Sequence, residues 1–316
     1  MTGSAVALQS ALHAAIAPQV VDPGDALQAL AIALVARGHV LLQGPPGLGK
    51  TLLARSFCAA LGGRFQRVQG TADLMPTDIT GVHVFDAQRQ QFSFRPGPLF
   101  ADVLLFDELN RAGPRTQSAL LEAMQERQVT TERETLPLAP DFLVVATQNP
   151  RDYEGTFPLP ESQLDRFLLR VDVDYPDRAT EAAIIGRYGA QFARQPPAAP
   201  APATVDAALL GAARREAAEV HLSDAVAGYV LDLAAASREQ PSIALGLSTR
   251  GVLAVVAAAR VAAALRGSDF VSADDVKRVA AWTIAHRLLP TPDAIVEGWS
   301  DTGAVASLLT QVAVPR

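Results

Sequence analysis

The chain has 316 residues, 49% of them hydrophobic but only 6% aromatic, which suggests two domains whose cores consist mainly of aliphatic side chains. The formal net charge of −6 argues against a surface for duplex nucleic acid, because such surfaces usually carry a basic excess. No apolar run approaches the roughly 18 residues of a membrane span, and the N-terminus lacks the pattern of a signal peptide, so we expect a cytoplasmic protein.

The first part of the chain predicts alternating helices and strands. Residues 5–18 and 24–37 carry apolar side chains at helical spacing. A short apolar run at 39–43 predicts a strand, and the residues from about 50 to 61 predict a helix. Residues 65–69 predict the next strand, which completes a strand–loop–helix–strand unit of the kind found in parallel sheets.

A phosphate-binding loop is predicted between that first strand and the helix after it. The residues are Gly44-Pro45-Pro46-Gly47-Leu48-Gly49-Lys50-Thr51, followed by Leu52, and they satisfy the pattern G-x-x-x-x-G-K-[ST]. A triphosphate needs a concave row of backbone N–H donors at a helix N-terminus. We expect Lys50 to reach the β- and γ-phosphates and Thr51 to place its hydroxyl on Mg²⁺. A Gly/Pro-rich turn that binds nothing is the alternative, and the agreement of eight positions argues against it.

Two hairpins are predicted within this α/β region. Apolar residues at 82, 84, 92 and 94 alternate around a polar tip, which predicts a hairpin inserted between 70 and 100. A helix over 114–127 then leads into a second predicted hairpin, residues 128–131 and 135–138.

A buried strand over 103–106 ends in two acids, Asp107 and Glu108. Adjacent carboxylates at the end of such a strand are costly unless they have a function there, and ligands of α/β sheets bind at that edge. We therefore expect Asp107 to hold Mg²⁺ mainly through water and Glu108 to polarise the attacking water. The alternative is a helix N-cap.

The next predicted strand, 142–147, is followed by Gln148-Asn149-Pro150. Asn149 can hydrogen-bond the attacking water or the γ-phosphate, although an Asn-Pro pair more commonly starts a turn. Residues 160–167 predict a short helix that carries Arg166, and 168–173 predict the last strand. Taken alone, Arg166 is an ordinary surface arginine.

A Pro/Ala-rich segment near residue 195 predicts a linker. We place the domain boundaries at 1–192 for the α/β core, 193–204 for the linker and 205–316 for a helical lid. Helices are predicted over 205–220, 224–238, 250–266 and 273–288. Arg250 opens the third of these helices. The apolar stripe expected on that helix consists of Leu253, Val256, Ala257, Val261, Ala264 and Leu265.

The order of these motifs resembles the MoxR family of AAA+ ATPases over about residues 20–290. The resemblance rests on the phosphate loop, on residues 74–81, 105–111, 146–150 and 164–167, and on the Gly-x-Ser-Thr-Arg motif that ends at Arg250. It implies a P-loop core with a parallel five-stranded sheet, flanking helices and two inserted hairpins, followed by a small all-α lid.

Matched residue by residue, the resemblance implies three further roles. Asn149 is similar to sensor 1, Arg166 to the arginine finger that reaches a neighbouring subunit's γ-phosphate, and Arg250 to the sensor 2 arginine. Arg111 and Arg151 stay open as alternative fingers, and Arg250 can act on its own subunit's ATP or on a neighbour's.

The resemblance also implies a function. It is that of a Mg²⁺-dependent ATP hydrolase, acting as a ring, expected to be a hexamer, with a chaperone-like role in remodelling or maturing partner proteins and a von Willebrand factor A domain protein as partner. An AAA+ nucleic-acid motor and a magnesium-chelatase-type subunit stay open as alternatives. A non-catalytic nucleotide switch would need one of Lys50, Asp107, Glu108 or Asn149 to be missing, and all four are present.

Overall fold

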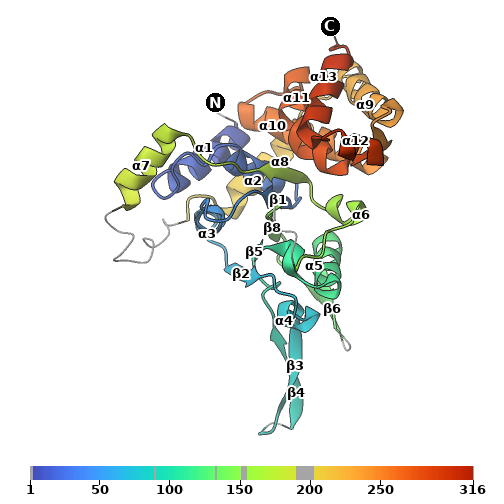
Figure 1. Cartoon of the computed structure of the whole chain (residues 1–316). Coiled ribbons are helices and arrows are strands. Elements are labelled where there is room, and N and C mark those ends of the chain that lie inside the picture. Colours follow the sequence, from blue (N-terminus) through green and yellow to red (C-terminus); the bar gives the residue numbers. More distant parts are fainter. Residues whose placement is uncertain (1–2, 89, 132–133, 151–154, 190–202, 316) are drawn as a thin grey trace.

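A parallel sheet of five strands forms the centre of the chain in the computed structural model, which describes residues 3–88, 90–131, 134–150, 155–189 and 203–315 (Figure 1). Its strands are β1 (Val40–Gln43), β2 (Phe65–Gln69), β5 (Val103–Asp107), β8 (Leu143–Gln148) and β9 (Leu169–Asp172), in the spatial order β2-β5-β8-β1-β9. All four pairings are parallel, so the five carboxyl ends lie along one edge. The predicted α/β sheet is confirmed.

The two faces of the sheet bury different side chains because successive residues of a strand point to opposite sides. One face packs into the larger hydrophobic core through Val40, Leu42, Val103, Leu105, Leu143, Val145, Leu169 and Val171. The other face packs into a second core through Leu41, Val68, Leu104, Phe106, Val144 and Ala146.

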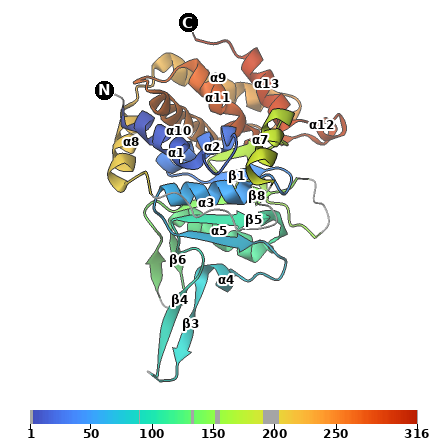
Figure 2. The same cartoon turned by 90° about the vertical axis from the view of Figure 1, so that its left-hand side faces the viewer.

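Helices cover both faces (Figure 2). On the larger core lie α1 (Ser4–Ile16), α2 (Gly24–Val35) and α3 (Lys50–Ala60), and on the smaller core lies α5 (Pro114–Glu126). Short helical turns, α4 (Pro76–Thr80), η1 (Leu109–Arg111) and α6 (Glu161–Leu164), connect the strands. Helix α7 (Arg178–Tyr188) follows β9 and buries none of its residues, and the sequence did not predict it.

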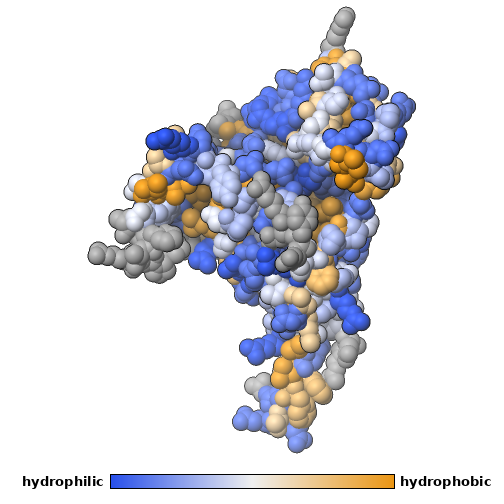
Figure 3. Space-filling view, in the orientation of Figure 1, coloured by the Kyte–Doolittle hydropathy of each residue, from blue (hydrophilic) through white to orange (hydrophobic). Residues whose placement is uncertain are grey.

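The two predicted hairpins are present. β3 (Gly81–Asp86) pairs with β4 (Gln91–Pro96), and β6 (Gln128–Thr130) pairs with β7 (Thr135–Pro137), both antiparallel. The longer one projects from the core and carries an apolar surface (Figure 3). Its large exposed apolar side chains are Val82, Val84, Phe85 and Phe92. A contact of 3.4 Å between His83 Nε2 and Glu134 Oε1 joins the two hairpins.

The C-terminal part is helical, as expected. It contains α8 (Ala207–Glu219), α9 (Asp224–Glu239), α10 (Thr249–Arg266), α11 (Ala273–Ile284), η2 (Ala285–Arg287), α12 (Pro292–Val296) and α13 (Asp301–Gln311). Serine side chains cap four of these helices, because Ser223, Ser248, Ser272 and Ser300 each accept a backbone N–H from the first turn. A short ribbon of β10 (Ile243–Leu245) and β11 (Leu289–Pro290) was not predicted.

The stripe predicted on α10 is partly wrong. Leu253 is 65% exposed, whereas Leu265 on the same helix is 2% exposed. The buried positions also include Val255 and Ala258, which lie outside the predicted stripe. The physical reason is that α10 is rich in alanine and packs against α11, α8 and α1, so that most of its circumference is apolar and the period does not identify a single face.

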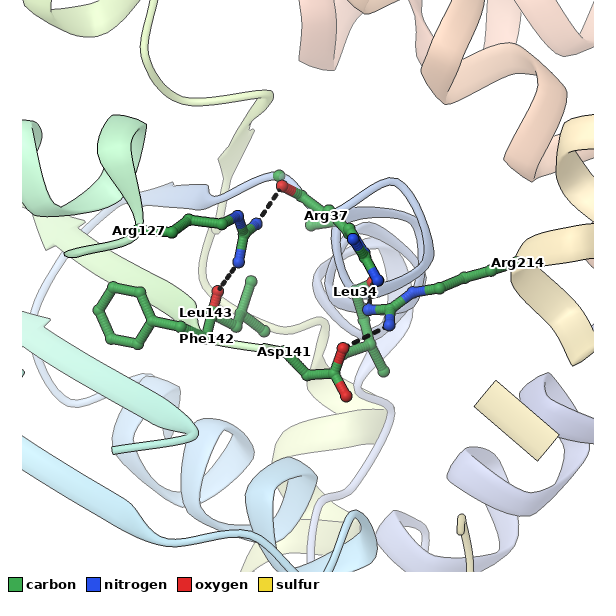
Figure 4. Close-up of a pocket in the computed structure, with 9 residues that line it drawn as sticks. Leu34, Arg37, Arg127, Asp141, Phe142, Leu143 and Arg214 are labelled. Atoms are coloured by element: carbon green, nitrogen blue, oxygen red, sulfur yellow. Dashed lines mark hydrogen bonds and ion pairs between the residues drawn. The ribbon is translucent and has the colours of Figure 1, made fainter. Parts of the chain in front are cut away.

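An ion pair and a hydrogen bond join helix α8 to the core at the amino edge of the sheet (Figure 4). Arg214 on α8 pairs with Asp141 and donates to the backbone oxygen of Leu34 at 2.8 Å. Beside it, Arg127 donates to the oxygens of Arg37 and Phe142 at 2.5 and 3.2 Å. Burial, together with the charges of Arg37 and Arg214, lowers the pKa of Arg127.

The predicted linker, 193–204, lies outside the described residues except for its last two positions. The backbone N–H groups of Thr204, at the end of this segment, and of Val205, just after it, both donate to the oxygen of Ala60, the last residue of α3. α8 then packs along α1, and residues of both helices belong to the larger core. None of the helices within the described ranges is long and apolar enough to cross a membrane.

Candidate nucleotide site

The predicted phosphate loop connects β1 to α3 at the carboxyl edge of the sheet. Gly44 donates its N–H to the oxygen of Gln148, and a Cβ at Gly44 would lie 2.1 Å from the oxygen of Val173, so only glycine fits there. Gly47 and Gly49 have φ of +85° and +77°, which favours glycine. Gly49 directly precedes α3, so the loop opens onto a helix N-terminus, where backbone N–H groups and the helix dipole favour anions.

The side chain of Lys50 folds back onto the start of this loop. Its Nζ donates to the backbone oxygens of Gly44 and Pro45 at 2.6 and 3.0 Å. Burial lowers the pKa of Lys50, and the nearby charges of Asp107 and Glu108 oppose that shift. The Lys50 ammonium therefore interacts electrostatically with both acids, and it lies on the loop that we expect to bind the phosphates.

Thr147 on β8 holds the two acids at the end of β5. Its hydroxyl donates to Asp107 Oδ1 at 2.6 Å and accepts the N–H of Glu108 at 2.9 Å. Thr147 is 2% exposed, so these bonds have little competition from water. Glu108 has a φ of +55°, a left-handed conformation that is uncommon outside glycine and that recurs at functional sites.

Each acid also contacts an arginine of the same chain. Arg67 on β2 donates from Nη2 and Nε to Asp107 Oδ2 at 2.7 and 3.2 Å. Arg111 Nε lies 3.1 Å from Glu108 Oε2. Arg111 thus lies within the site of its own chain, next to the residue expected to act on water.

Asn149 follows β8 and lines a cleft of about 380 Å³ beside the start of the phosphate loop. Gly44 and Pro45 border the cleft on the core side, and residues 299–302 border it on the lid side. An ion pair of 2.7 Å between the buried Arg170 and Asp301 connects core and lid there. The phosphate loop, the two acids and Asn149 therefore all lie at one edge of the sheet.

Arg166 lies at the opposite edge. It precedes β9, whose first residue pairs with Val40 and whose last residue pairs with Gln43, immediately before the phosphate loop. Its Nη1 donates to the oxygen of Leu121 and to Gln125 Oε1 at 3.2 and 2.5 Å, both in the C-terminal half of α5.

Arg250 lies in the same region as Arg166. Its Nε is 3.7 Å from Asp165 Oδ2, and the neighbouring oxygen of Asp165 accepts a bond of 2.6 Å from the buried Arg287. The Arg250 side chain is 54% exposed. Arg151, the remaining alternative finger, lies outside the described residues. Arg250 thus lies next to Asp165, the residue that precedes Arg166, and the contacts of both arginines lie before β9, at the edge of the sheet away from the phosphate loop.

The donor set at the carboxyl edge fits Mg²⁺. Thr51 is the second residue of α3 and supplies a hydroxyl, and Asp107 supplies a carboxylate; both are oxygen ligands of the kind Mg²⁺ prefers. Within the described residues there is no group of three or more His, Cys, Asp and Glu that could hold a metal. Mg²⁺ needs no such group when nucleotide phosphates and waters complete its shell.

Two residues that shape the site were missed in the sequence. Thr147 ends the predicted apolar strand 142–147, and a buried hydroxyl in such a run is itself a signal that a polar partner lies close by. Arg67 lies in the predicted strand 65–69, and nothing in the local sequence marks it as a site residue. Its partner Asp107 is 40 positions away in the chain, and only the register of β2 against β5 brings the two together.

Comparisons with known proteins show what the chain is similar to. Residues 39–169 match the family model of the ATPase family associated with various cellular activities (AAA), and residues 235–305 match the AAA lid domain. The uncharacterised protein YeaC of Bacillus subtilis is 41% identical over 90% of this chain and 87% of its own length. Chaperone MoxR1 of Mycobacterium tuberculosis is 39% identical over 94% of this chain and 80% of its own length.

A solved structure shows the same fold. The crystal structure of a candidate ATPase from Cytophaga hutchinsonii has a TM-score of 0.89 and 31% sequence identity, and the match covers 99% of this chain and 97% of that one. The parallel sheet, the phosphate loop and the paired acids define a P-loop ATPase of the AAA+ class with a helical lid. With relatives of this similarity over most of its length, the chain belongs to the MoxR family of AAA+ ATPases.

Proposed function

We propose that the chain is a Mg²⁺-dependent ATP hydrolase that works as a ring, expected to be a hexamer, with each active site shared between two copies. The observation that carries this is the position of Arg166 and Arg250 at the amino edge of the sheet, opposite the phosphate loop. The four residues of β9 alone span about 10 Å. If two copies pack head to tail, the arginines of one copy can contact the γ-phosphate bound to the phosphate loop of the other.

ATP binding follows from the carboxyl edge. The backbone of residues 44–52 receives the phosphates, and Lys50 exchanges its bonds to the loop carbonyls for phosphate oxygens. Thr51 and Asp107 would hold Mg²⁺, which supplies positive charge to the β- and γ-phosphates when it is bound. Thr147 keeps the Asp107 carboxylate in place for this role.

Hydrolysis transfers the γ-phosphoryl group to water. The water oxygen forms a bond to the γ-phosphorus, the bond to the bridging β–γ oxygen breaks, and Glu108 takes up the proton of the water. Asn149 orients the water or the γ-phosphate from the end of β8. Arg166 of a neighbouring copy stabilises the charge that develops on the phosphate, a contribution of roughly 10³ or more in rate.

We extend the proposal to a chaperone-like role in remodelling or maturing partner proteins, with a von Willebrand factor A domain protein as one partner. The support is the similarity to a protein named Chaperone MoxR1, together with the exposed apolar surface of the β3–β4 hairpin. Nucleotide-dependent motion of such hairpins would act on a bound protein.

Mixing two inactive variants tests the shared site. Arg166→Ala keeps its phosphate loop and Lys50→Ala keeps its arginines, so a mixed ring contains sites built from the intact half of each. Random mixing in equal amounts pairs half of the Arg166→Ala sites with an intact arginine, which restores about a quarter of the wild-type rate per subunit. Phosphate release is the measurement.

A matched mixture controls for non-specific rescue. Lys50→Ala and Glu108→Gln both damage the carboxyl edge, so no arrangement of these two variants completes a site, and their mixture should stay inactive. Absence of rescue in the first mixture, with assembly verified by mass photometry, would contradict the shared site.

A further inference from the structure

Both oxygens of the Asp107 carboxylate are engaged by the chain itself. Thr147 donates to Oδ1, whereas Arg67 donates to Oδ2 from two nitrogens. Arg67 lies opposite Leu105 in the register of β2 and β5, and Leu105 packs in the core that α3 covers. Arg67 therefore approaches Asp107 from the face of the sheet that carries the phosphate loop.

The hydrogen bond from Thr147 to Asp107 is buried and fixed, whereas the ion pair with Arg67 is exposed and can break more easily. Thr147 is buried and also receives the N–H of Glu108, so its hydroxyl is fixed from two sides. Arg67 has a side chain that is 48% exposed, against 16% for Asp107, and it has a second acceptor in Gln69 Oε1 at 3.0 Å. An exposed guanidinium with a second acceptor can leave a carboxylate at little cost, because water screens it.

We propose that Arg67 is a positioning residue that competes with Mg²⁺ for Asp107 and thereby sets the metal affinity of the nucleotide site. This inference rests on the Mg²⁺ dependence proposed above. The guanidinium holds Oδ2 and keeps the carboxylate oriented, and the ion pair loosens when the metal–nucleotide complex binds. The reason is electrostatic, since a guanidinium and a dication that share one carboxylate repel each other. Arg111 differs, because it pairs with Glu108 three residues away on the same turn.

The test compares Arg67→Met, Arg67→Gln and Arg67→Lys in the full chain. Binding of a fluorescent ADP analogue is measured in EDTA and across a Mg²⁺ titration, and Mn²⁺ binding to the ADP complex is followed by electron paramagnetic resonance. Removal of one unit charge at about 8 Å from a dication in water-like surroundings predicts half-saturation at about 5-fold lower metal concentration in Arg67→Met and Arg67→Gln. Affinity for the nucleotide in EDTA stays at the wild-type value, and Arg67→Lys shows a smaller shift.

Arg55→Met is the matched control. Arg55 lies on α3 over the ring of Phe65 and is exposed. Phe65 is at the far end of β2 from Gln69, which pairs with Asp107, so this variant removes a positive charge that does not touch Asp107. Its metal half-saturation should equal that of the wild type. An unchanged or raised Mg²⁺ requirement in both neutral Arg67 variants overturns the inference.

The wild-type titration separates this outcome from failure of the proposed function. Loss of Mg²⁺ dependence in the wild type would contradict the proposed function itself, whereas a normal wild-type dependence without a shift in the variants contradicts only the role of Arg67. Melting temperatures of the three variants show whether the fold is retained, and Arg67→Lys keeps the test valid if both neutral variants unfold.

Discussion

Glu108 combines a left-handed backbone with a side chain that lies beside Lys50 and Arg111. Substitution to Gln keeps its size and its backbone bond to Thr147 but removes the proton acceptor. We expect turnover to fall by about 100-fold or more, because a positioned general base contributes at least that much, while the nucleotide Kd changes little. Phosphate release at saturating ATP and titration with fluorescent ADP measure the two quantities.

Glu122→Gln on the exposed side of α5 is the control for that substitution, since it removes the same charge away from the site. Equal turnover in Glu108→Gln and the wild type would remove Glu108 from the mechanism.

His39 predicts a pH dependence of stability. Burial lowers the pKa of His39 to about 4, with its ring bonded to the oxygen of Met124 and the N–H of Val144. An unfolded histidine titrates near 6.5, so the folded state loses stability as the pH falls from about 6.5 towards 4, at about 1.4 kcal/mol per pH unit. Between pH 7.5 and pH 5 this one group removes about 2 kcal/mol.

Urea unfolding of the wild type and of His39→Gln at the two pH values measures the difference. The variant is less stable at pH 7.5, but its decline to pH 5 should be smaller by that amount. His13→Gln, on the exposed side of α1, should decline as the wild type does. Parallel profiles for wild type and His39→Gln would show that His39 does not carry the effect.

At the level of single residues, the sequence could identify those whose identity is tied to a local pattern. Lys50 and Thr51 follow from the spacing of glycines, and Asp107 follows from a charge at the end of an apolar run. Thr147 and Arg67 could not be identified, because their importance depends on which strand lies beside which.

At the level of elements, α10 offers a test within one helix. Leu265 is 2% exposed and Leu253 is 65% exposed, although the sequence placed both on one stripe. Leu265→Ala should lower the free energy of unfolding by about 2 to 5 kcal/mol through lost burial and a cavity, whereas Leu253→Ala should change it by less than about 0.5 kcal/mol. Urea unfolding at pH 7.5 gives both values, and equal effects would contradict the packing of α10.

The helices and strands of the core were predictable because each has a buried face, and burial leaves a period in the sequence. Helix α7 leaves no such period, since none of its residues is buried. The β10–β11 ribbon was missed for another reason. Its strands have three and two residues, too few for an alternation to be recognised.

For the whole molecule, a site shared between copies makes activity depend on assembly. The ATPase rate per subunit should rise with protein concentration and level off once assembly is complete, because the proposed site takes Arg166 from a neighbouring copy and a lone copy cannot supply it. Steady-state rates measured alongside mass photometry over the same dilution series test this. A constant rate per subunit across dissociation into single copies would mean that one chain completes its own site.

In the proposed assembly the contacts between copies have a direction, because the arginines and the phosphate loop lie at opposite ends of β9. Each copy donates arginines at one edge of its sheet and accepts them at the other. In an open row of copies, the phosphate loop at one end therefore lacks an arginine from a neighbour, and the arginines at the other end have no phosphate loop to contact. Closure into a ring completes every site. The effect of a substitution at Arg166 also has a direction. A copy without Arg166 inactivates the site of the one neighbour to which it contributes the arginine, and the site of its other neighbour keeps its activity.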